Sequence, residues 1–216
     1  MFGPVKNFVL KRVVEVLTFD LIFHQPSLMK NRNKTGVIVA LGDSVTAGFE
    51  VKSEERYTTF LESYLLSEGF DHYSIIPQGV SGNKTADGLA RIDKALALRP
   101  EILILELGGN DFLQGLPVAE VRQNLVKIIE LARAQNTEIL LVGILATLKY
   151  GFGYVWESRQ MYRSLAREFD LVFMPHVMRK TLLRKHLMLP DHIHPNGRGY
   201  RVVARTMWPY LRRLLK

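Results

Sequence analysis

Short apolar runs alternate with longer segments of helical periodicity along most of this chain. Five runs rich in Ile, Leu and Val, bounded by Gly, Pro or charged residues, occupy 36–41, 73–77, 101–107, 138–145 and 170–174. Such runs are typical of strands in a parallel sheet that is covered on both faces. Apolar residues recur at spacings of three and four over 57–69, 85–98, 117–135, 156–168 and 197–215. This second pattern predicts helices.

The alternation of strands and helices predicts an α/β fold with right-handed crossovers and helices on both faces of the sheet. Ligands of open parallel sheets bind outside the carboxyl ends of the strands. Four segments rich in Gly or polar residues are expected near that edge: "LGDSVTAG", "QGVSGNKTADG", "GGNDFLQG" and "LPDHIHPNGRG". We therefore expect a site that is assembled from several loops.

The first 35 residues differ from the rest of the chain. The stretch "VKNFVLKRVVEVLTFDLIF" is apolar but interrupted by four charged residues, Lys11, Arg12, Glu15 and Asp20. It has neither the continuous apolar core of a cleavable signal peptide nor the length of a membrane span. Its polar residues form one stripe on a helical wheel, which predicts an amphipathic helix that docks on the domain or lies on a membrane. We therefore divide the chain into an extension with a linker, 1–35, and a domain, 36–216.

Composition and charge narrow the class of protein. With 216 residues, 47% hydrophobic and 23% charged, the chain can bury a sizeable core in a single globular domain. The absence of cysteine excludes disulfides, thiolate metal sites and a cysteine nucleophile. The net charge of +8 is concentrated at the ends, and residues 179–216 carry ten Lys or Arg against Asp191 alone. Such a basic fringe attracts phosphates or keeps the protein soluble, and no nucleic-acid partner is expected.

Three residues could carry acyl transfer at the predicted edge of the sheet. Ser44 follows the first strand, and Asp191 precedes His194 by three residues on a late loop. Acyl transfer requires a nucleophile, a base, an acid that orients the base, and donors for an oxyanion. The order Ser, Asp, His is that of α/β-hydrolases, but "GDSVT" lacks the second glycine of their nucleophile elbow and follows the first strand. A plain strand-to-helix turn is the simpler interpretation of "GDS" alone.

Four ordered blocks resemble those of the SGNH hydrolases, also called GDSL-type esterases and lipases. They are "ALGDSVTAG", "SGN" at 81–83, "GGND" at 108–111 and "DHIHP" at 191–195. The stretches "GLARID", "LELGGND" and "LAREFDL" resemble the bacterial branch of multifunctional thioesterases, arylesterases and lysophospholipases. The resemblance runs from Gly36 to the C-terminus and implies a flavodoxin-like α/β/α sandwich with a five-stranded parallel sheet. Val45 stands where the family label has leucine.

The resemblance implies a role for each matched residue. Ser44 would be the nucleophile, Asp191 the orienting acid and His194 the base. The backbone N–H groups of Ser44 and Gly82 and the side-chain amide of Asn110 would form the oxyanion hole. Glycine allows close backbone approach to a ligand, and a side-chain amide is a neutral donor. No cofactor is implied.

Neighbouring polar residues have other expected roles. Asp43 and Asp111 are expected to accept structural hydrogen bonds, and His192 is expected to be exposed. Asp191, His192 and His194 could together hold zinc, but no second cluster in the sequence completes such a site. We therefore predict no metal.

The substrate is an acyl ester or thioester in this interpretation, of the aryl ester, lysophospholipid or acyl-CoA type. Apolar residues that could line an acyl groove, or pack beneath their own loops, are Phe112, Leu113, Leu116, Tyr150, Phe152, Tyr154 and Trp156. A carbohydrate O-deacetylase with the same blocks is one alternative. A flavodoxin-like module that binds phosphorylated ligands or membranes without catalysis is another.

Expectations about location and partners follow from the two basic ends. Residues 1–35 and the basic C-terminus could contact a membrane peripherally, and docking of residues 1–35 on the domain is the alternative. A cytoplasmic or membrane-peripheral protein is favoured, and the family resemblance also allows the periplasm. The sequence predicts no oligomeric state.

Overall fold

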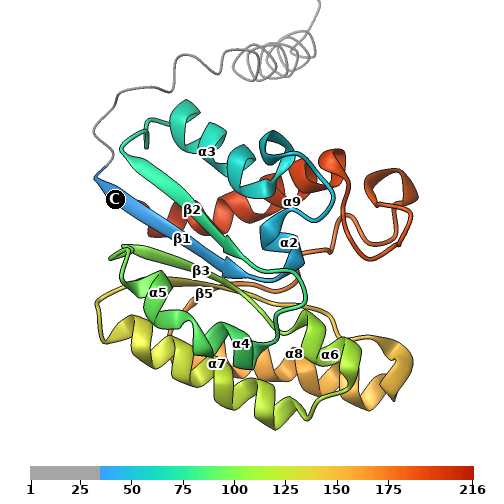
Figure 1. Ribbon diagram of the computed structural model, residues 1–216. Coiled ribbons are helices and arrows are strands. Elements are labelled where there is room, and N and C mark those ends of the chain that lie inside the picture. Colours follow the sequence, from blue (N-terminus) through green and yellow to red (C-terminus); the bar gives the residue numbers. More distant parts are fainter. Residues whose placement is uncertain (1–34) are drawn as a thin grey trace, which may run out of the picture. The chain divides into compact units, whose positions relative to one another are not determined.

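Five parallel strands form the centre of the molecule. The computed structural model describes residues 35–216, so the predicted N-terminal helix and linker, except Thr35, lie outside the described residues. The strands are β1 (Gly36–Gly42), β2 (Tyr73–Gly79), β3 (Ile102–Glu106), β4 (Glu138–Val142) and β5 (Val172–Met174). Their order in the sheet is β2-β1-β3-β4-β5 (Figure 1). This is the flavodoxin-like order, and it confirms the predicted α/β architecture.

Helices cover both faces of the sheet. On one face, α3 (Tyr57–Ser67) packs against α9 (Gly197–Leu211); the other carries α4 (Thr85–Ala90), α5 (Ile92–Leu96), α7 (Val118–Arg133) and α8 (Gly151–Glu168) (Figure 1). Two short helices, α2 (Ser44–Ala47) and α6 (Gly109–Gln114), directly follow β1 and β3. Single 3-10 turns occupy Ser53–Glu55, Leu148–Tyr150, Lys185–Leu187 and Arg212–Leu214. No helix within residues 35–216 combines the length and apolar character needed to cross a bilayer.

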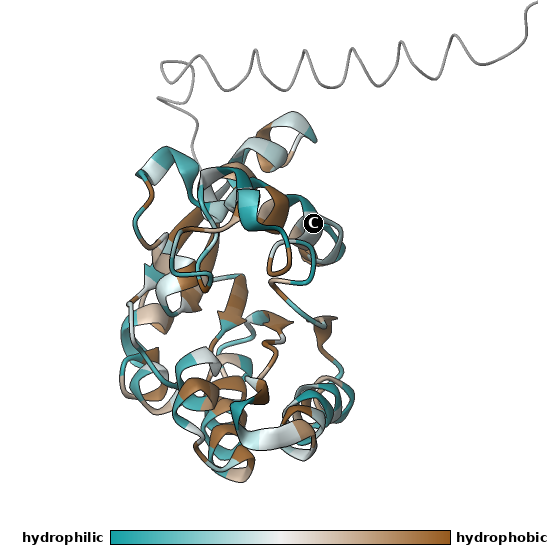
Figure 2. Cartoon of the chain, turned by 90° about the vertical axis from the view of Figure 1, so that its right-hand side faces the viewer, coloured by the Kyte–Doolittle hydropathy of each residue, from teal (hydrophilic) through white to brown (hydrophobic). Residues whose placement is uncertain are grey.

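The apolar runs of the sequence form the core. Ile38, Val39, Ala40 and Leu41 of β1 are fully buried, and every residue of β3 is buried. The strands are hydrophobic between two helical layers whose outer faces are more hydrophilic (Figure 2). Burial of apolar side chains on both faces of the sheet explains why the strands read as continuous apolar runs instead of alternating ones.

Three predicted element boundaries are wrong. The helix predicted over 85–98 is two helices, because Arg91 between them has a non-helical backbone and turns its guanidinium toward the strand ends. The helix predicted from 156 begins at Gly151, whose φ of +88° only glycine adopts easily. The strand predicted over 138–145 ends at Val142, and the apolar residues after it line a cavity instead.

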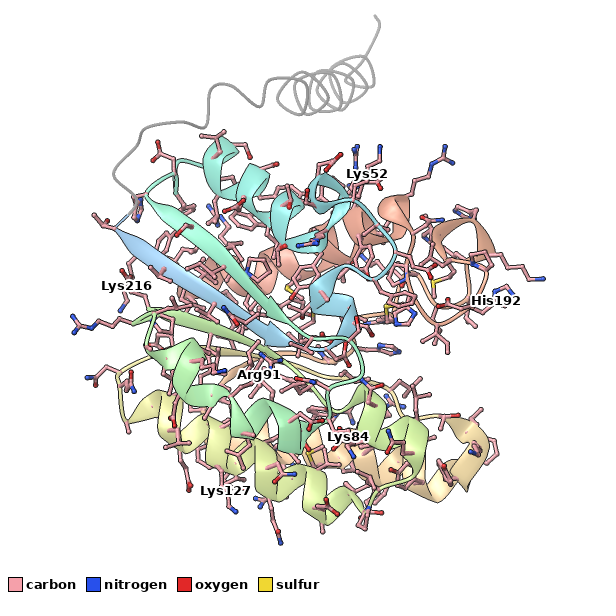
Figure 3. The ribbon with its side chains drawn as sticks, viewed as in Figure 1. Lys52, Lys84, Arg91, Lys127, His192 and Lys216 are labelled. Atoms are coloured by element: carbon pink, nitrogen blue, oxygen red, sulfur yellow. The ribbon has the colours of Figure 1, made fainter. Side chains whose placement is uncertain are left out.

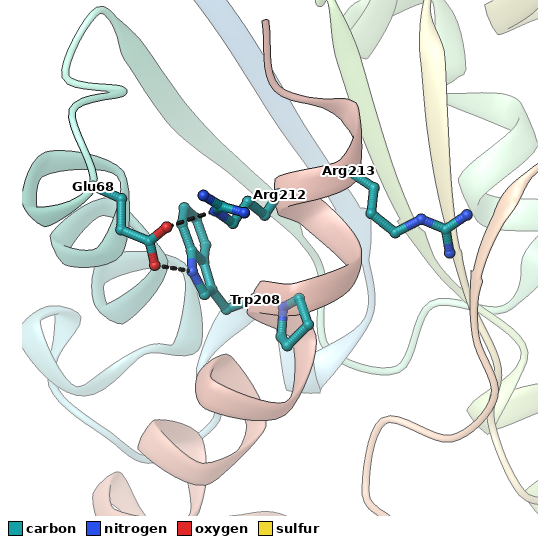
Figure 4. A pocket seen from close by; sticks show the side chains of 5 residues that line it. Glu68, Trp208, Arg212 and Arg213 are labelled. Atoms are coloured by element: carbon teal, nitrogen blue, oxygen red, sulfur yellow. Dashed lines mark hydrogen bonds and ion pairs between the residues drawn. The ribbon is translucent and has the colours of Figure 1, made fainter. Parts of the chain in front are cut away.

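The C-terminal helix is fixed to the end of α3 by one carboxylate. Glu68 accepts hydrogen bonds from Trp208 Nε1 and from Arg212 Nε, each at 2.6 Å (Figure 4). The Trp208 ring also stacks on Tyr64, with centroids 5.4 Å apart. These contacts hold α9 against α3 within one helical layer. The loop that carries His194 leads directly into α9.

The strand order reverses between β1 and β3, which makes their carboxyl ends the expected ligand site. Gly42 at the end of β1 lies opposite Gly79 of β2 and Glu106 of β3. The segments that follow these three strands therefore meet at one point of the sheet edge. They include Ser44, Gly82 and Asn110.

Candidate active site

Ser44 lies on a tight turn between β1 and α2. Asp43 caps this short helix, because its Oδ1 accepts from the N–H of Val45 at 3.0 Å. A side-chain acceptor at this position satisfies a backbone donor that the helix itself cannot pair. Ser44 is 9% exposed and lines a cavity of about 480 Å³. The turn therefore presents the hydroxyl to an accessible space while the backbone below it is fixed.

The loop of Asp191 and His194 reaches the same hydroxyl. His194 Nε2 lies 2.8 Å from Ser44 Oγ, and His194 Nδ1 lies 2.6 Å from Asp191 Oδ2. Asp191 Oδ1 also accepts from the N–H groups of Ile193 and His194, at 2.9 and 3.0 Å. Although desolvation acts to raise it, these hydrogen bonds from His194 and Ile193 lower the pKa of Asp191 to about 2. Asp191 is therefore ionised at neutral pH and accepts from the Nδ1–H of His194.

Phe49 holds the imidazole from a third direction. Its ring stacks on the His194 ring, with centroids 4.3 Å apart and planes at 29°. The stacking restricts rotation of an imidazole whose two nitrogens are already engaged. Sequence reasoning missed Phe49, and its position five residues after Ser44 was the only available signal.

Three donors face the cavity beside Ser44. The backbone N–H groups of Ser44 and Gly82 donate to no other backbone group within 35–216. Gly82 has a φ of +84° and open space where a side chain would begin, so a ligand can approach its backbone. Asn110 Nδ2 donates to Asn83 O at 3.0 Å, and its second contact, to Asp43 Oδ2, is long at 3.4 Å. A contact of that length is weak, so the second N–H of this amide is available to a substrate oxygen.

This geometry can be compared with known proteins. The sequence matches the GDSL-like Lipase/Acylhydrolase family over residues 40–202, three quarters of the chain. The chain belongs to this family. The match makes it an ester-bond hydrolase.

Individual relatives of the hydrolase agree with this assignment. Esterase TesA of Pseudomonas aeruginosa is 30% identical over 189 residues, which cover 87% of this chain and 94% of the relative. Thioesterase 1/protease 1/lysophospholipase L1 of Escherichia coli K12 is 31% identical over 179 residues, with 82% and 84% covered. The crystal structure of AlinE4, an SGNH-hydrolase family esterase, has a TM-score of 0.71 at 37% identity, with 86% and 100% covered. The sequence resemblance to this family is confirmed.

Arg91 connects the segment that carries Gly82 to the sheet of the hydrolase. Its guanidinium donates to Gln78 O in β2, to Gly42 O in β1 and to Asn83 Oδ1, each at 2.8 Å. Asn83 in turn accepts from Asn110 through its backbone oxygen. One side chain therefore fixes two strand ends and the segment that carries Gly82. Arg91 points toward these strand ends in Figure 3.

Two buried carboxyl groups lie beneath the hydrolase's serine turn. Burial raises the pKa of Asp43 to about 6, although the Val45 N–H and His194 offset part of this rise. Glu106 accepts from Thr46 Oγ1 at 2.9 Å, and burial, followed by the neighbouring Asp43 carboxyl, raises its pKa well above the ordinary value. Glu106 was not singled out from the sequence. The sequence feature that could have indicated it is an acid at the end of an otherwise apolar strand.

The remaining polar residues also lie near the site. Asp111 accepts from the backbone N–H and hydroxyl of Thr85, at 3.0 and 2.6 Å, and so ties α6 to the start of α4. Asp43 and Asp111 thus accept hydrogen bonds that fix the loops of Ser44 and Asn110. His192 is exposed at the rim (Figure 3). In the part of the chain that the structure describes, no three His, Asp or Glu side chains gather as a metal site would require.

The cavity has a mostly apolar wall that sequence reasoning identified only in part. Leu113 lines it, whereas Phe112 is buried against Tyr154 and Tyr162. Tyr150 and Tyr154 donate to the backbone oxygens of Leu113 and Leu116, and Phe152 and Trp156 are exposed outside the cavity. Apolar lining residues not singled out from the sequence are Phe49, Ile144, Leu145, Ala146, Leu148, Val177, Met178, Leu182 and Ile193. The sequence features that could have indicated such residues are the apolar run that continues beyond β4 and the leucines of 179–190.

Proposed function

We propose that this protein hydrolyses carboxylic esters and thioesters through an acyl-enzyme formed on Ser44. The observation that carries the proposal is the pair of consecutive contacts that joins Ser44 Oγ to the His194 imidazole, at 2.8 Å, and the imidazole to the Asp191 carboxylate, at 2.6 Å. His194 takes the serine proton as the oxygen attacks the acyl carbon. Asp191 keeps the imidazole in the required tautomer and stabilises the imidazolium that forms.

The charge that develops on the carbonyl oxygen is stabilised by the N–H groups of Ser44 and Gly82 and by the amide of Asn110. Preorganised donors of this kind supply a large share of the rate enhancement in acyl transfer. When the tetrahedral intermediate collapses, His194 returns the proton to the leaving alcohol or thiol. Water activated by the same imidazole then attacks the acyl-enzyme, and Ser44 is regenerated.

The cavity supports a substrate with an apolar acyl group. Its volume of about 480 Å³ and its aliphatic wall, which includes Ile144, Leu148 and Met178, suit a hydrocarbon chain beside the reacting carbonyl. The relatives named as an esterase and as a thioesterase and lysophospholipase support the same substrate class. In this proposal, 36–216 form the catalytic domain and 1–35 form an extension. The binding partner in this proposal is the substrate, a small acyl ester or thioester, and no nucleic acid binds.

A panel of substrates tests the proposal. We expect turnover of p-nitrophenyl esters and acyl-CoA thioesters of increasing chain length, with little release of acetate from acetylated sugars. Ser44→Ala and His194→Asn should each lower kcat by at least about 1,000-fold. His192→Asn is the matched control, because it changes the other histidine of the same loop and asparagine tolerates its φ of +58°. Equal activity in His194→Asn and His192→Asn would contradict the assignment of the base.

A further inference from the structure

A basic, leucine-containing loop borders the cavity mouth. Between β5 and α9, residues 179–186 read "RKTLLRKH". Leu182 and Leu183 are 40% and 96% exposed, so the second leucine has almost no contact with the protein. A fully exposed leucine costs solvation free energy with no return in packing. Its presence at the tip of this loop needs another explanation.

The loop carries four cations and no acid. Arg179 and Lys180 precede the two leucines, and Arg184 and Lys185 follow them. All four side chains are exposed, and none forms an ion pair with another residue of 35–216. The chain has no Asp or Glu at 171–190. The loop therefore presents two exposed leucines that are flanked in sequence by cations without an ion-pair partner among the described residues.

The same loop belongs to the wall of the reaction cavity. Leu182 and Leu148 both line the cavity that contains Ser44, and 59% of the surface of Leu148 is exposed. Leu148 directly precedes the first turns of α8, where Phe152 and Trp156 are 82% and 66% exposed. The loop and the start of α8 lie at the same end of the domain (Figure 1). Leu148 and Leu182 therefore belong both to the cavity wall and to the exposed surface beside it.

We infer that residues 179–186 dock this protein on an anionic phospholipid bilayer, with Leu183 inserted among the acyl chains and the four cations at the headgroups. Uncompensated cations match anionic headgroups, and an isolated leucine between them suits a fluid layer better than a protein groove, which would need a continuous complementary surface. Delivery of lipid acyl chains to Ser44 rests on the proposed function. Contact with the bilayer does not.

A single fluorescent label can report insertion of the loop. Because the chain has no cysteine, Leu183→Cys provides a unique site for the environment-sensitive dye NBD. The experiment uses the full-length Ser44→Ala protein, so that hydrolysis has no part in the result. With phosphatidylcholine vesicles that contain phosphatidylglycerol, we expect NBD emission to rise and shift to shorter wavelength. Leu131→Cys on α7, where the native leucine is also partly exposed, is the matched control and should show no change.

Charge is tested in the same labelled protein. Arg184→Gln with Lys185→Gln should weaken the vesicle titration about 25-fold, because each cation near an anionic surface strengthens binding about fivefold. The control pair Lys94→Gln with Lys127→Gln removes the same charge from exposed positions on α5 and α7 and should shift the midpoint much less.

Four results would overturn the inference. No change of NBD emission at 183 with anionic vesicles would exclude insertion of the loop, even if another segment binds them. An equal response to vesicles of pure phosphatidylcholine, or an equal shift in both charge variants, would remove the role of the four cations. A response to soluble polyglutamate but not to vesicles would point to an acidic protein partner instead.

Discussion

Replacement of Arg91 should impair catalysis by disturbing groups that Arg91 contacts only indirectly. Arg91 reaches no atom of Ser44 or His194, but it donates to Gly42 O, Gln78 O and Asn83 Oδ1 at 2.8 Å. Asn83 O in turn accepts from Asn110 Nδ2 at 3.0 Å. Arg91→Met keeps much of the length of the side chain and removes all three donors. The proposed oxyanion donors then lose their link to the sheet.

The contacts give the size of the effect. Removing a charged donor from a buried acceptor costs about 1.5–3 kcal/mol of stabilisation. Because the guanidinium is only half-buried, solvent screens its interactions, and we take about 3 kcal/mol as the total loss for the three hydrogen bonds. A displacement of about 1 Å at a catalytic donor can cost about 100-fold in rate. We therefore expect kcat to fall by about 10- to 100-fold while KM changes little, because these donors act mainly in the transition state.

A double-mutant cycle separates positioning from general destabilisation. If Arg91 acts through the proposed oxyanion donors, Arg91→Met should cost at least about tenfold less in kcat in an Asn110→Ala background than in the wild type. Arg91→Lys should recover only part of the activity, because a single ammonium cannot reproduce the planar fork of the guanidinium. The assay is steady-state hydrolysis of a p-nitrophenyl ester, with a urea titration of each variant. A wild-type kcat in Arg91→Met would refute the reasoning. A loss of kcat in the double variant equal to the product of the two single losses would refute it as well.

Three further variants test the site in other ways. Asn110→Ala should lower kcat by about 100- to 1,000-fold with little change in KM; a change confined to KM would remove it from the oxyanion hole. Burial raises the pKa of Asp43 from 3.8 to about 6. The favourable contribution of protonated Asp43 to the free energy of unfolding is therefore complete below pH 3.8 and is lost as the pH rises through about 6. In urea titrations, the stability of Asp43→Asn relative to the wild type should therefore rise by up to about 3 kcal/mol from pH 4 to 7; a difference independent of pH would contradict this. Gly108→Ala should destabilise the fold by about 2–4 kcal/mol, because φ is +123° and the new Cβ would lie 2.3 Å from Tyr162 Oη; an unchanged urea midpoint would argue against it.

The strands and the order of the site blocks could be predicted from the sequence because each depends on local composition. The continuous apolar run at 36–41 indicates a doubly covered strand, and the glycines and polar residues after it indicate the edge where ligands bind. The triad candidates were found because the family blocks preserve their residue types in order. Their mutual distances depend on the fold and had to come from the structure.

Residues that act through long-range contacts could not be identified in this way. Arg91 reads as a surface cation in a helical pattern, but its guanidinium turns inward and breaks the predicted helix. Phe49 reads as a loop aromatic, and only the path of the chain brings its ring to His194. Phe112 reads as a groove residue, yet the short helix α6 turns it into the core. A pattern reports the local environment of a residue, and these three are placed by segments distant in the sequence.

The central claim is that Ser44 is an activated nucleophile, and covalent labelling tests it most directly. A fluorophosphonate probe reacts with a serine whose hydroxyl is activated by a base, so intact-protein and peptide mass spectrometry should find one adduct on Ser44. Ser44→Ala should carry none, and His194→Asn should label at least about 100-fold more slowly. Absence of the adduct from the folded wild-type protein, or labelling of Ser44 at the same rate in His194→Asn, would contradict the account.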